Sequence, residues 1–261
     1  LWTAHRVRTA TQTFQKMAGF AQNKRVRPYL APGATNGIRS ANGEQEIRFR
    51  NGSRILFGAR EAGFGRGFDE VDGLTGPLIG RAQSATYRTS DVVGLDTMAH
   101  VIKTMGDTLP NDPWHAFFKS PAWLDGLIAK GALGQKTRAG IFRKVGKDIL
   151  VLDVDKQDYR LSDRGASAEV VEILKIKNPA EKFAQLRASS HPQAQFLWAL
   201  FRDLFHYSAY HLADIADTAR DVDFAIRWGY GWKLGPFETW QAAGWQQVAQ
   251  WIAEDIAAGK A

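Results

Sequence analysis

The feature that most restricts the fold of this sequence is an internal repeat. Residues 70–102, EVDGLTGPLIGRAQSATYRTSDVVGLDTMAHVI, align with residues 221–252, DVDFAIRWGYGWKLGPFETWQAAGWQQVAQWI. Four pairs anchor the alignment: Asp72 with Asp223, Gly80 with Gly231, Tyr87 with Phe237, and Gly94 with Gly244. The second copy is one residue shorter in the middle. Each copy predicts a helix, a glycine-rich loop, a short helix and a further helix. This region must therefore fold into two similar helical units and bury the apolar face of each.

The rest of the chain after residue 72 also predicts helices between Gly and Pro turns. Helices are expected from Ser90 to about Met105, from Ser120-Pro121 to Gly131, from Pro179, from 193 to 216, from Thr218 to Trp228, and in a final pair around Gly244 that ends near Ala258. Residues 141–152, IFRKVGKDILVL, instead predict a short hairpin that turns at Gly146-Lys147.

The first 72 residues differ in composition from the remainder of the chain. They contain 12 Lys and Arg against 6 Asp and Glu, a balance of +6, whereas residues 73–261 contain 22 against 21. Trp2 is their only Trp, and the other eight lie from Trp114 onward. A basic segment favours contact with a polyanion, although a solubilised surface explains the charge as well. Periodicity predicts a helix over 9–20 and a hairpin over 46–58 with a type I′ turn at Asn51-Gly52.

The bulk properties predict a globular protein of one large or two ordinary domains. The 261 residues are 44% hydrophobic, enough for real cores. No apolar run approaches the roughly 20 residues of a membrane span, so we expect a cytoplasmic protein. The absence of Cys excludes disulfides and thiolate chemistry. Because the sequence begins at Leu1 and not at Met, we expect a fragment.

Residues 63–80, GFGRGFDEVDGLTGPLIG, combine two glycine-rich turns with an Asp-Glu pair and so suggest a nucleotide site. A phosphate loop needs G-x-x-x-x-G-K-[ST], which does not occur in the chain. Asp69-Glu70 follows a glycine-rich stretch and not the buried strand that a metal-binding acidic motif requires. We therefore do not expect a self-contained ATPase site, and the second glycine-rich turn belongs to the repeat.

Other catalytic patterns are weak. His206 and His211 lie five residues apart on one predicted helix, whereas ligands on a helical face need a spacing of three or four, so local hydrogen bonding is favoured over a metal site. No G-x-S-x-G elbow is present. We interpret one aromatic series as helix packing in preference to a stacking platform: Trp228, Tyr230, Trp232, Phe237, Trp240 and Trp245.

Residues 1–72 contain the strings WTAHRVRTATQTFQKMAGFAQ and NGEQEIRFRNGSRILFGAREAGFGRGFDEVD. They resemble part of the ATPase domain of a phage terminase large subunit, which drives DNA packaging. In that family a phosphate loop precedes this helix and an apolar strand ending in Asp-Glu comes after it, and neither occurs here. The resemblance places Arg60 and Arg66 near the nucleotide.

Residues 70–261 contain the repeat together with LIAKGALGQKTRAGIFRK. They resemble the helical C-terminal region of a bacterial multidomain 3-hydroxyacyl-CoA dehydrogenase of fatty-acid β-oxidation. The resemblance implies a mainly α fold of helical repeats like the C-terminal domain of 6-phosphogluconate dehydrogenase, preceded here by a small α+β fragment. The family's LGxKTGxG string spans 133–140, with Arg138 in place of a glycine. The NAD-binding domain and the long helix that opens the first repeat are missing.

Together these resemblances predict a chimera joined near residues 69–72. The predicted parts are a terminase-like ATPase fragment (1–72), the end of a first helical dehydrogenase domain with a short hairpin (73–155) and a second helical repeat (156–261). The function implied is that of a dehydrogenase fragment, with a DNA-packaging motor fragment as the alternative. No catalytic, cofactor-binding or metal-binding residue is assigned, and we expect the chain to be inactive alone.

The resemblance also bears on ligands and partners. NAD is the cofactor of the full-length family, and none is expected on this chain. Acyl-CoA is implied as a weakly bound ligand, a homo-oligomer is allowed, and no membrane partner is expected. Nucleic acid becomes a partner only if the terminase-like part determines the function.

Overall fold

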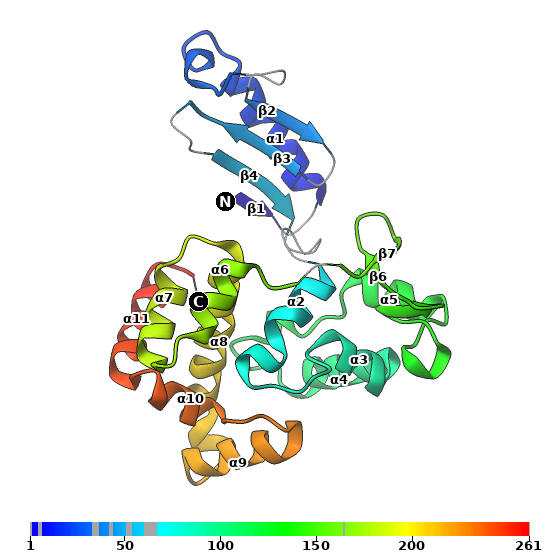
Figure 1. Cartoon of the computed structure of the whole chain (residues 1–261), viewed down its shortest axis with the longest axis vertical. Coiled ribbons are helices and arrows are strands. Elements are labelled where there is room, and N and C mark those ends of the chain that lie inside the picture. Colours follow the sequence, from blue (N-terminus) through cyan, green and yellow to red (C-terminus); the bar gives the residue numbers. More distant parts are fainter. Residues whose placement is uncertain are drawn as a thin grey trace.

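The structure is a computed structural model that describes residues 2–4, 7–32, 37–41, 44–50, 54–59, 67–163 and 165–260. It is mainly helical, as the sequence predicts, with two small sheets (Figure 1). We refer to residues 67–260 as the helical part. Within the described residues, no helix is long and apolar enough to cross a membrane.

The first sheet lies in the N-terminal part and is covered by one helix (Figure 1). Its strand order is β1-β4-β3-β2, in which β1 runs parallel to β4 and the other neighbours are antiparallel. The strands are β1 (Trp2–Ala4), β2 (Ile38–Ala41), β3 (Glu44–Arg48) and β4 (Arg54–Ala59). Helix α1 (Val7–Ala21) packs on β4, β3 and β1, and a short 3-10 helix, η1 (Arg27–Tyr29), comes after it. Phe14, Ala21, Leu30 and Ile47 form the buried cluster of this part.

The β3–β4 hairpin is present, and the predicted type I′ turn at Asn51-Gly52 lies outside the described residues. The register pairs Ile47 with Ile55 and Arg48 with Arg54. A shift of one residue moves a strand's whole apolar set to the other face, so the alternating pattern determines the register. In the neighbouring pair, Ala41 of β2 lies opposite Glu44 of β3.

The helical part begins with the first copy of the repeat. Its elements are α2 (Phe68–Thr75), the 3-10 helix η3 (Pro77–Ile79), α3 (Tyr87–Val93) and α4 (Leu95–Thr108). Glu70 accepts a hydrogen bond from the Gly67 amide at 3.4 Å and closes the start of α2. Asp69 and Glu70 therefore lie in the first turn of a helix, and α2 spans the predicted boundary at residue 72.

A second sheet and a short helix pack against this first copy. The elements are η4 (His115–Phe117), α5 (Ala122–Ala129), η5 (Gln135–Thr137), β5 (Phe142–Val145), β6 (Asp148–Asp153) and β7 (Asp158–Leu161). The antiparallel order β5-β6-β7 contains the predicted 141–152 hairpin, and β7 is an additional strand. Seven buried residues unite these elements: Phe68, Leu95, Leu124, Leu127, Ile141, Val151 and Leu152.

The remaining helices surround one long helix, α8 (Figure 1). They are α6 (Ala168–Lys175), α7 (Pro179–Ala188), α8 (Pro192–Ile215), α9 (Ala219–Tyr230), α10 (Pro236–Ala242) and α11 (Trp245–Ala257). Their largest buried cluster contains Leu197, Phe201 and Phe205 of α8, and Leu74 of α2 also belongs to it. The first copy of the repeat is thus packed into the core of the second.

The two copies of the repeat have the same local structure, which confirms the predicted alignment. In each, a helix leads through a loop to a short helix and then a longer one: α2, α3 and α4, and α9, α10 and α11. Gly80 and Gly231 both adopt the left-handed conformation, with φ of 78° and 67°. The copies touch at these loops, because the Lys233 amide donates to the Gly80 carbonyl at 2.9 Å and the Arg81 guanidinium lies 4.0 Å from the Trp232 ring centre.

Candidate functional site

The LGQKTRAG turn (133–140) is built around the buried carboxylate of Asp91. The backbone amides of Ile141 and Phe142 donate to it at 2.8 and 2.7 Å. A side chain at Gly134 would collide with the Asp91 backbone, and one at Gly140 with its carboxylate. Burial raises the pKa of Asp91, and the two amide hydrogen bonds offset only part of this effect. The glycines of this string therefore have a structural role, which is to let the turn close on Asp91.

Arg138, which stands where the similar family has glycine, adopts φ 60° and ψ 11°. This left-handed conformation costs a residue with a Cβ about 1–2 kcal/mol. The turn thus keeps the left-handed backbone that a glycine would adopt at this position, and Arg138 is strained there. The Thr137 hydroxyl donates to the Ala139 carbonyl at 3.0 Å and accepts from the Leu133 amide at 2.8 Å, which fixes the turn.

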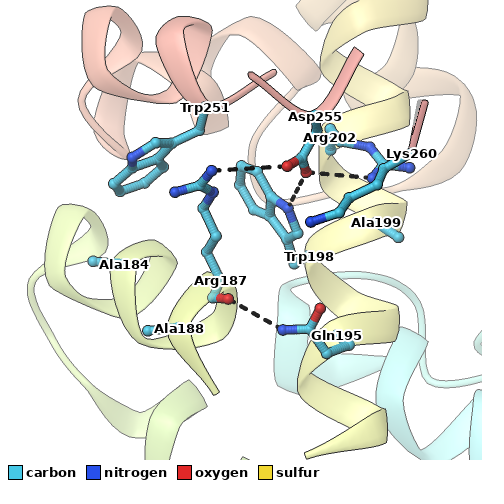
Figure 2. Close-up of a pocket in the computed structure, with 10 residues that line it drawn as sticks. All are labelled: Ala184, Arg187, Ala188, Gln195, Trp198, Ala199, Arg202, Trp251, Asp255 and Lys260. Carbon is cyan, nitrogen blue, oxygen red and sulfur yellow. Dashed lines mark hydrogen bonds and ion pairs between the residues drawn. The ribbon is translucent and has the colours of Figure 1, made fainter. Parts of the chain in front are cut away.

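A pocket of about 420 Å³ lies where α7, α8 and α11 meet. In Figure 2, Arg187 of α7, Trp198 and Arg202 of α8, and Trp251 and Asp255 of α11 point toward one another. Sequence reasoning did not find this group, because its members lie on three helices separated by up to 68 residues. Helical spacing alone marks Trp198 and Trp251 as packing residues.

Asp255 is the centre of the hydrogen bonds in this pocket. Its carboxylate accepts from the Trp198 indole at 2.8 Å and from the Arg202 guanidinium at 3.4 Å (Figure 2). Arg187 lies 3.7 Å from the same carboxylate and donates to Glu254 at 2.6 Å. The guanidinium of Arg187 also lies over the Trp251 ring, 5.3 Å from its centre.

The charged groups of this pocket contact one another: Asp255 with Arg202 and Arg187, and Glu254 with Arg187. Asp255 and Arg202 are only 4% and 6% exposed. A buried pair with these partners chiefly fixes the positions of α8 and α11.

His206 and His211 lie beside Asp112, which comes after α4 in the chain. The His211 ring nitrogen Nε2 lies 3.0 Å from the Asp112 carboxylate, and the Tyr207 hydroxyl donates to it at 2.9 Å. Trp114 packs edge-on against both His206 and Tyr207. Within the described residues, His211 Nε2 and His206 Nδ1 have no hydrogen-bond partner, so the predicted local hydrogen bonding of these histidines is not confirmed. No group of three or more metal-ligating side chains occurs in the described part of the chain.

The aromatic series 228–245 divides into packed and exposed members. Trp240 stacks on Phe205 with ring centres 5.5 Å apart, as the packing interpretation predicts. That interpretation is wrong for Trp228, Tyr230 and Trp245, which are 80%, 66% and 56% exposed.

The two sequence-predicted site residues, Arg60 and Arg66, lie outside the described residues. A basic pocket does occur in the N-terminal part, with a volume of about 430 Å³. Lys24, Arg27 and Arg50 line it and no acidic residue does. Part of the excess positive charge of the N-terminal part thus lines this pocket.

Part of the chain is similar to known proteins. Residues 68–144 match the model of the family "3-hydroxyacyl-CoA dehydrogenase, C-terminal domain". The match runs from the start of α2 through α4, α5 and the LGQKTRAG turn into β5. These residues are therefore similar to that domain.

Several curated proteins are similar over a longer stretch. A "Probable 3-hydroxyacyl-CoA dehydrogenase" of Bacillus subtilis is 39% identical over 181 residues, which is 69% of this chain and 23% of the relative. A protein of Deinococcus radiodurans with the same description is 43% identical over 75 residues, 29% of this chain and 21% of the relative. A "Putative fatty acid oxidation complex trifunctional enzyme" of Rickettsia felis is 25% identical over 188 residues, 69% of this chain and 25% of the relative.

The chain thus spans about a quarter of the length of these relatives. The matching part of the chain is similar to a segment of each of these relatives. The family model matches no residue before 68, and the comparisons give no support to the terminase resemblance of residues 1–72. No solved structure matches the chain significantly.

Proposed function

We propose that residues 68–260 serve as the helical region of an NAD-dependent 3-hydroxyacyl-CoA dehydrogenase, which oxidises 3-hydroxyacyl-CoA to 3-ketoacyl-CoA in fatty-acid β-oxidation. The single observation that carries this proposal is the match of residues 68–144 to the C-terminal domain of that family. The turn around Asp91 supports it, because Gly134 and Gly140 approach Asp91 closely and belong to the string that resembles the family's. A cytoplasmic location is part of this proposal.

The residues present do not fit NAD. A dinucleotide needs a glycine-rich turn between a strand and a helix, where backbone amides meet the pyrophosphate. Between the end of β1 and the start of α1 the sequence has only His5 and Arg6, and neither is a glycine. We therefore assign the helical part a scaffolding role beside the substrate and expect it to bind acyl-CoA weakly, with catalysis supplied by protein outside residues 68–260.

A domain replacement tests this role. The segment of the Bacillus subtilis relative that aligns with residues 68–260 is exchanged for them, and NADH formation is followed by absorbance with a 3-hydroxyacyl-CoA. We expect activity within about tenfold of the unaltered relative. The matched control carries Asp91→Ala, which removes the acceptor of two buried amides and should abolish activity by unfolding the turn. A soluble, folded hybrid without activity would contradict the proposal.

The chain alone should neither reduce NAD with a hydroxyacyl-CoA nor hydrolyse ATP. Hydride transfer needs a held nicotinamide and a positioned base, and base help alone contributes typically ~10²–10⁴ in rate. ATP hydrolysis needs phosphate-cradling amides, a Lys and a Mg²⁺ site. If either assay shows turnover, and a substitution in this chain abolishes it, the chain contains an active site that we have missed.

A second candidate function concerns the N-terminal part and is favoured by its basic pocket. We propose that Lys24, Arg27 and Arg50 together bind a polyanion such as nucleic acid. Affinity for a labelled oligonucleotide should fall steeply with salt and drop further in a Lys24→Ala/Arg27→Ala variant. Equal affinity in the variant would remove this candidate.

A further inference from the structure

The pocket between α7, α8 and α11 combines apolar walls with several cationic side chains. Its volume of about 420 Å³ is within the range of pockets that hold small organic molecules. The apolar lining consists of Trp198, Trp251, Ala184, Ala188 and Ala199 (Figure 2). Ala184 and Ala188 lie four residues apart and therefore on the same face of α7. Because alanine side chains are short, they leave room for a ligand beside the Trp251 ring.

The lining of this pocket also has an excess of positive charge. Its cationic members are Arg187, Arg202 and Lys260. Its one acidic member is Asp255, which is buried. The other carboxylates that bond to the two arginines belong to Glu254 and Asp203, whose side chains are 48% and 47% exposed. Water screens these two exposed carboxylates, so the interior of the pocket stays positive.

Each of the three cations keeps a donor without an acceptor. Arg187 donates to Glu254 through Nη2, and Arg202 donates through Nε and Nη1. Within the described residues, no acceptor bonds to Nη1 of Arg187, Nη2 of Arg202 or the ammonium of Lys260. The buried unpaired nitrogen of the two arginines is Nε of Arg187, so Nη1 and Nη2 are open to solvent. Three donor groups can therefore bind a ligand.

We propose that this pocket binds an amphipathic carboxylate, a small organic monoanion with an apolar chain. Its carboxylate bonds to the free donors of the cations, and its chain lies along the alanines of α7 and the Trp251 ring. A guanidinium suits this ligand, because its N–H groups lie in one plane and can meet both oxygens of a carboxylate. The site goes beyond the proposed dehydrogenase role and does not depend on it.

Charge distinguishes this ligand from a phosphate. Both arginines already have carboxylate partners, whereas Lys260 is the one lining cation that forms no ion pair in the described part of the chain. A single negative charge on the ligand therefore completes the pairing. A phosphate dianion would bring a second negative charge close to the buried carboxylate of Asp255, which is unfavourable.

Calorimetric titration of the full chain with hexanoate at neutral pH tests the proposal. We expect saturable binding at a single site. Hexanamide has the same shape without the charge, and acetate has the charge without the chain. Both should bind at least about tenfold more weakly, because each lacks one half of the recognised ligand. Inorganic phosphate should also bind more weakly than hexanoate.

Two pairs of variants locate the site. Lys260→Ala should weaken hexanoate binding by at least about threefold. Its matched control is Lys177→Ala, at an exposed position outside the pocket lining. Ala188→Leu fills the pocket without changing its charge and should weaken binding by at least about tenfold. Its matched control is Ala253→Leu, at an exposed position of α11 outside the lining, and both controls should bind like the unaltered chain.

The variants must first be shown to fold, by circular dichroism and urea unfolding. If Ala188→Leu unfolds, Lys260→Ala still tests the site, because it changes an exposed side chain. Absence of saturable hexanoate binding, or equal binding by the pocket variants and their controls, would overturn the proposal. Binding of hexanamide or phosphate as tight as that of hexanoate would also overturn it, because the pocket would then select an uncharged ligand or a bare anion.

Discussion

Asp72 and Asp223 occupy equivalent places in the two copies of the repeat, and each holds the start of a short helix. The Asp72 carboxylate accepts from the amides of Thr86, Tyr87 and Arg88 at 2.6–3.1 Å. That of Asp223 accepts from Phe237 and Glu238 at 2.8 and 3.0 Å. A carboxylate 14 to 16 residues earlier in the chain thus replaces the ordinary helix cap and joins the two ends of each loop.

Replacing Asp223 by Ala should destabilise the protein by about 1–3 kcal/mol, because two amides at the start of α10 lose their acceptor. Chemical unfolding in urea measures the change. Asp217→Ala, at an exposed position just before α9, is the control and should change stability by less than about 0.5 kcal/mol. Equal effects of the two substitutions would show that the carboxylate does not cap α10.

Replacing Arg138 by glycine should stabilise the protein by about 1 kcal/mol. The gain comes from removing a Cβ from a left-handed backbone, and the greater freedom of glycine in the unfolded chain reduces it. Arg138→Lys keeps the Cβ and should leave stability unchanged. An unfolding midpoint that falls in the glycine variant would mean that the arginine side chain contributes more than the strain costs.

The helical repeat could be predicted from sequence because it depends on short-range signals. Asp72, Gly80 and Gly94 recur at matching places, and apolar residues recur at helical spacing between them. The N-terminal sheet could be predicted only in part. Its outer strand β1 has three residues and pairs with β4 more than 50 residues away, so no local alternation marks it.

The pocket was beyond prediction for a related reason. Arg187, Trp198 and Asp255 meet only because α7, α8 and α11 pack together, and an acidic residue on an amphipathic helix is usually exposed.

Breaking the ion pair between Asp69 and Arg160 should cost about 3 kcal/mol. Arg160 of β7 donates to both oxygens of Asp69 at 2.6 and 2.9 Å, and the two side chains are 3% and 18% exposed for Asp69 and Arg160. In an Arg160→Met variant the buried charge of Asp69 loses both of these bonds. An Asp69→Asn/Arg160→Met double variant removes the charge as well and should recover part of the loss.

The control for the Asp69 and Arg160 variants is a surface ion pair, Lys103 and Asp107, whose side chains are 71% and 62% exposed. Lys103→Met should cost no more than about 0.5 kcal/mol, because water and salt screen this pair. If Arg160→Met costs no more stability than Lys103→Met, the ion pair to β7 does not stabilise the start of α2.

The contribution of Tyr207 to stability should disappear in alkali. Burial, and then its hydrogen bond to Asp112, raise the pKa of Tyr207 from 10.0 to about 12. Since the folded state holds this proton more tightly than the unfolded state, the contribution is complete below pH 10 and is lost as the pH rises toward 12. Urea unfolding between pH 9 and pH 12 should therefore show the stabilities of the unaltered protein and Tyr207→Phe converging. Tyr210→Phe, at a 55% exposed position on the same helix, should follow the unaltered protein throughout, and a constant gap between the unaltered protein and Tyr207→Phe would contradict the assigned hydrogen bond.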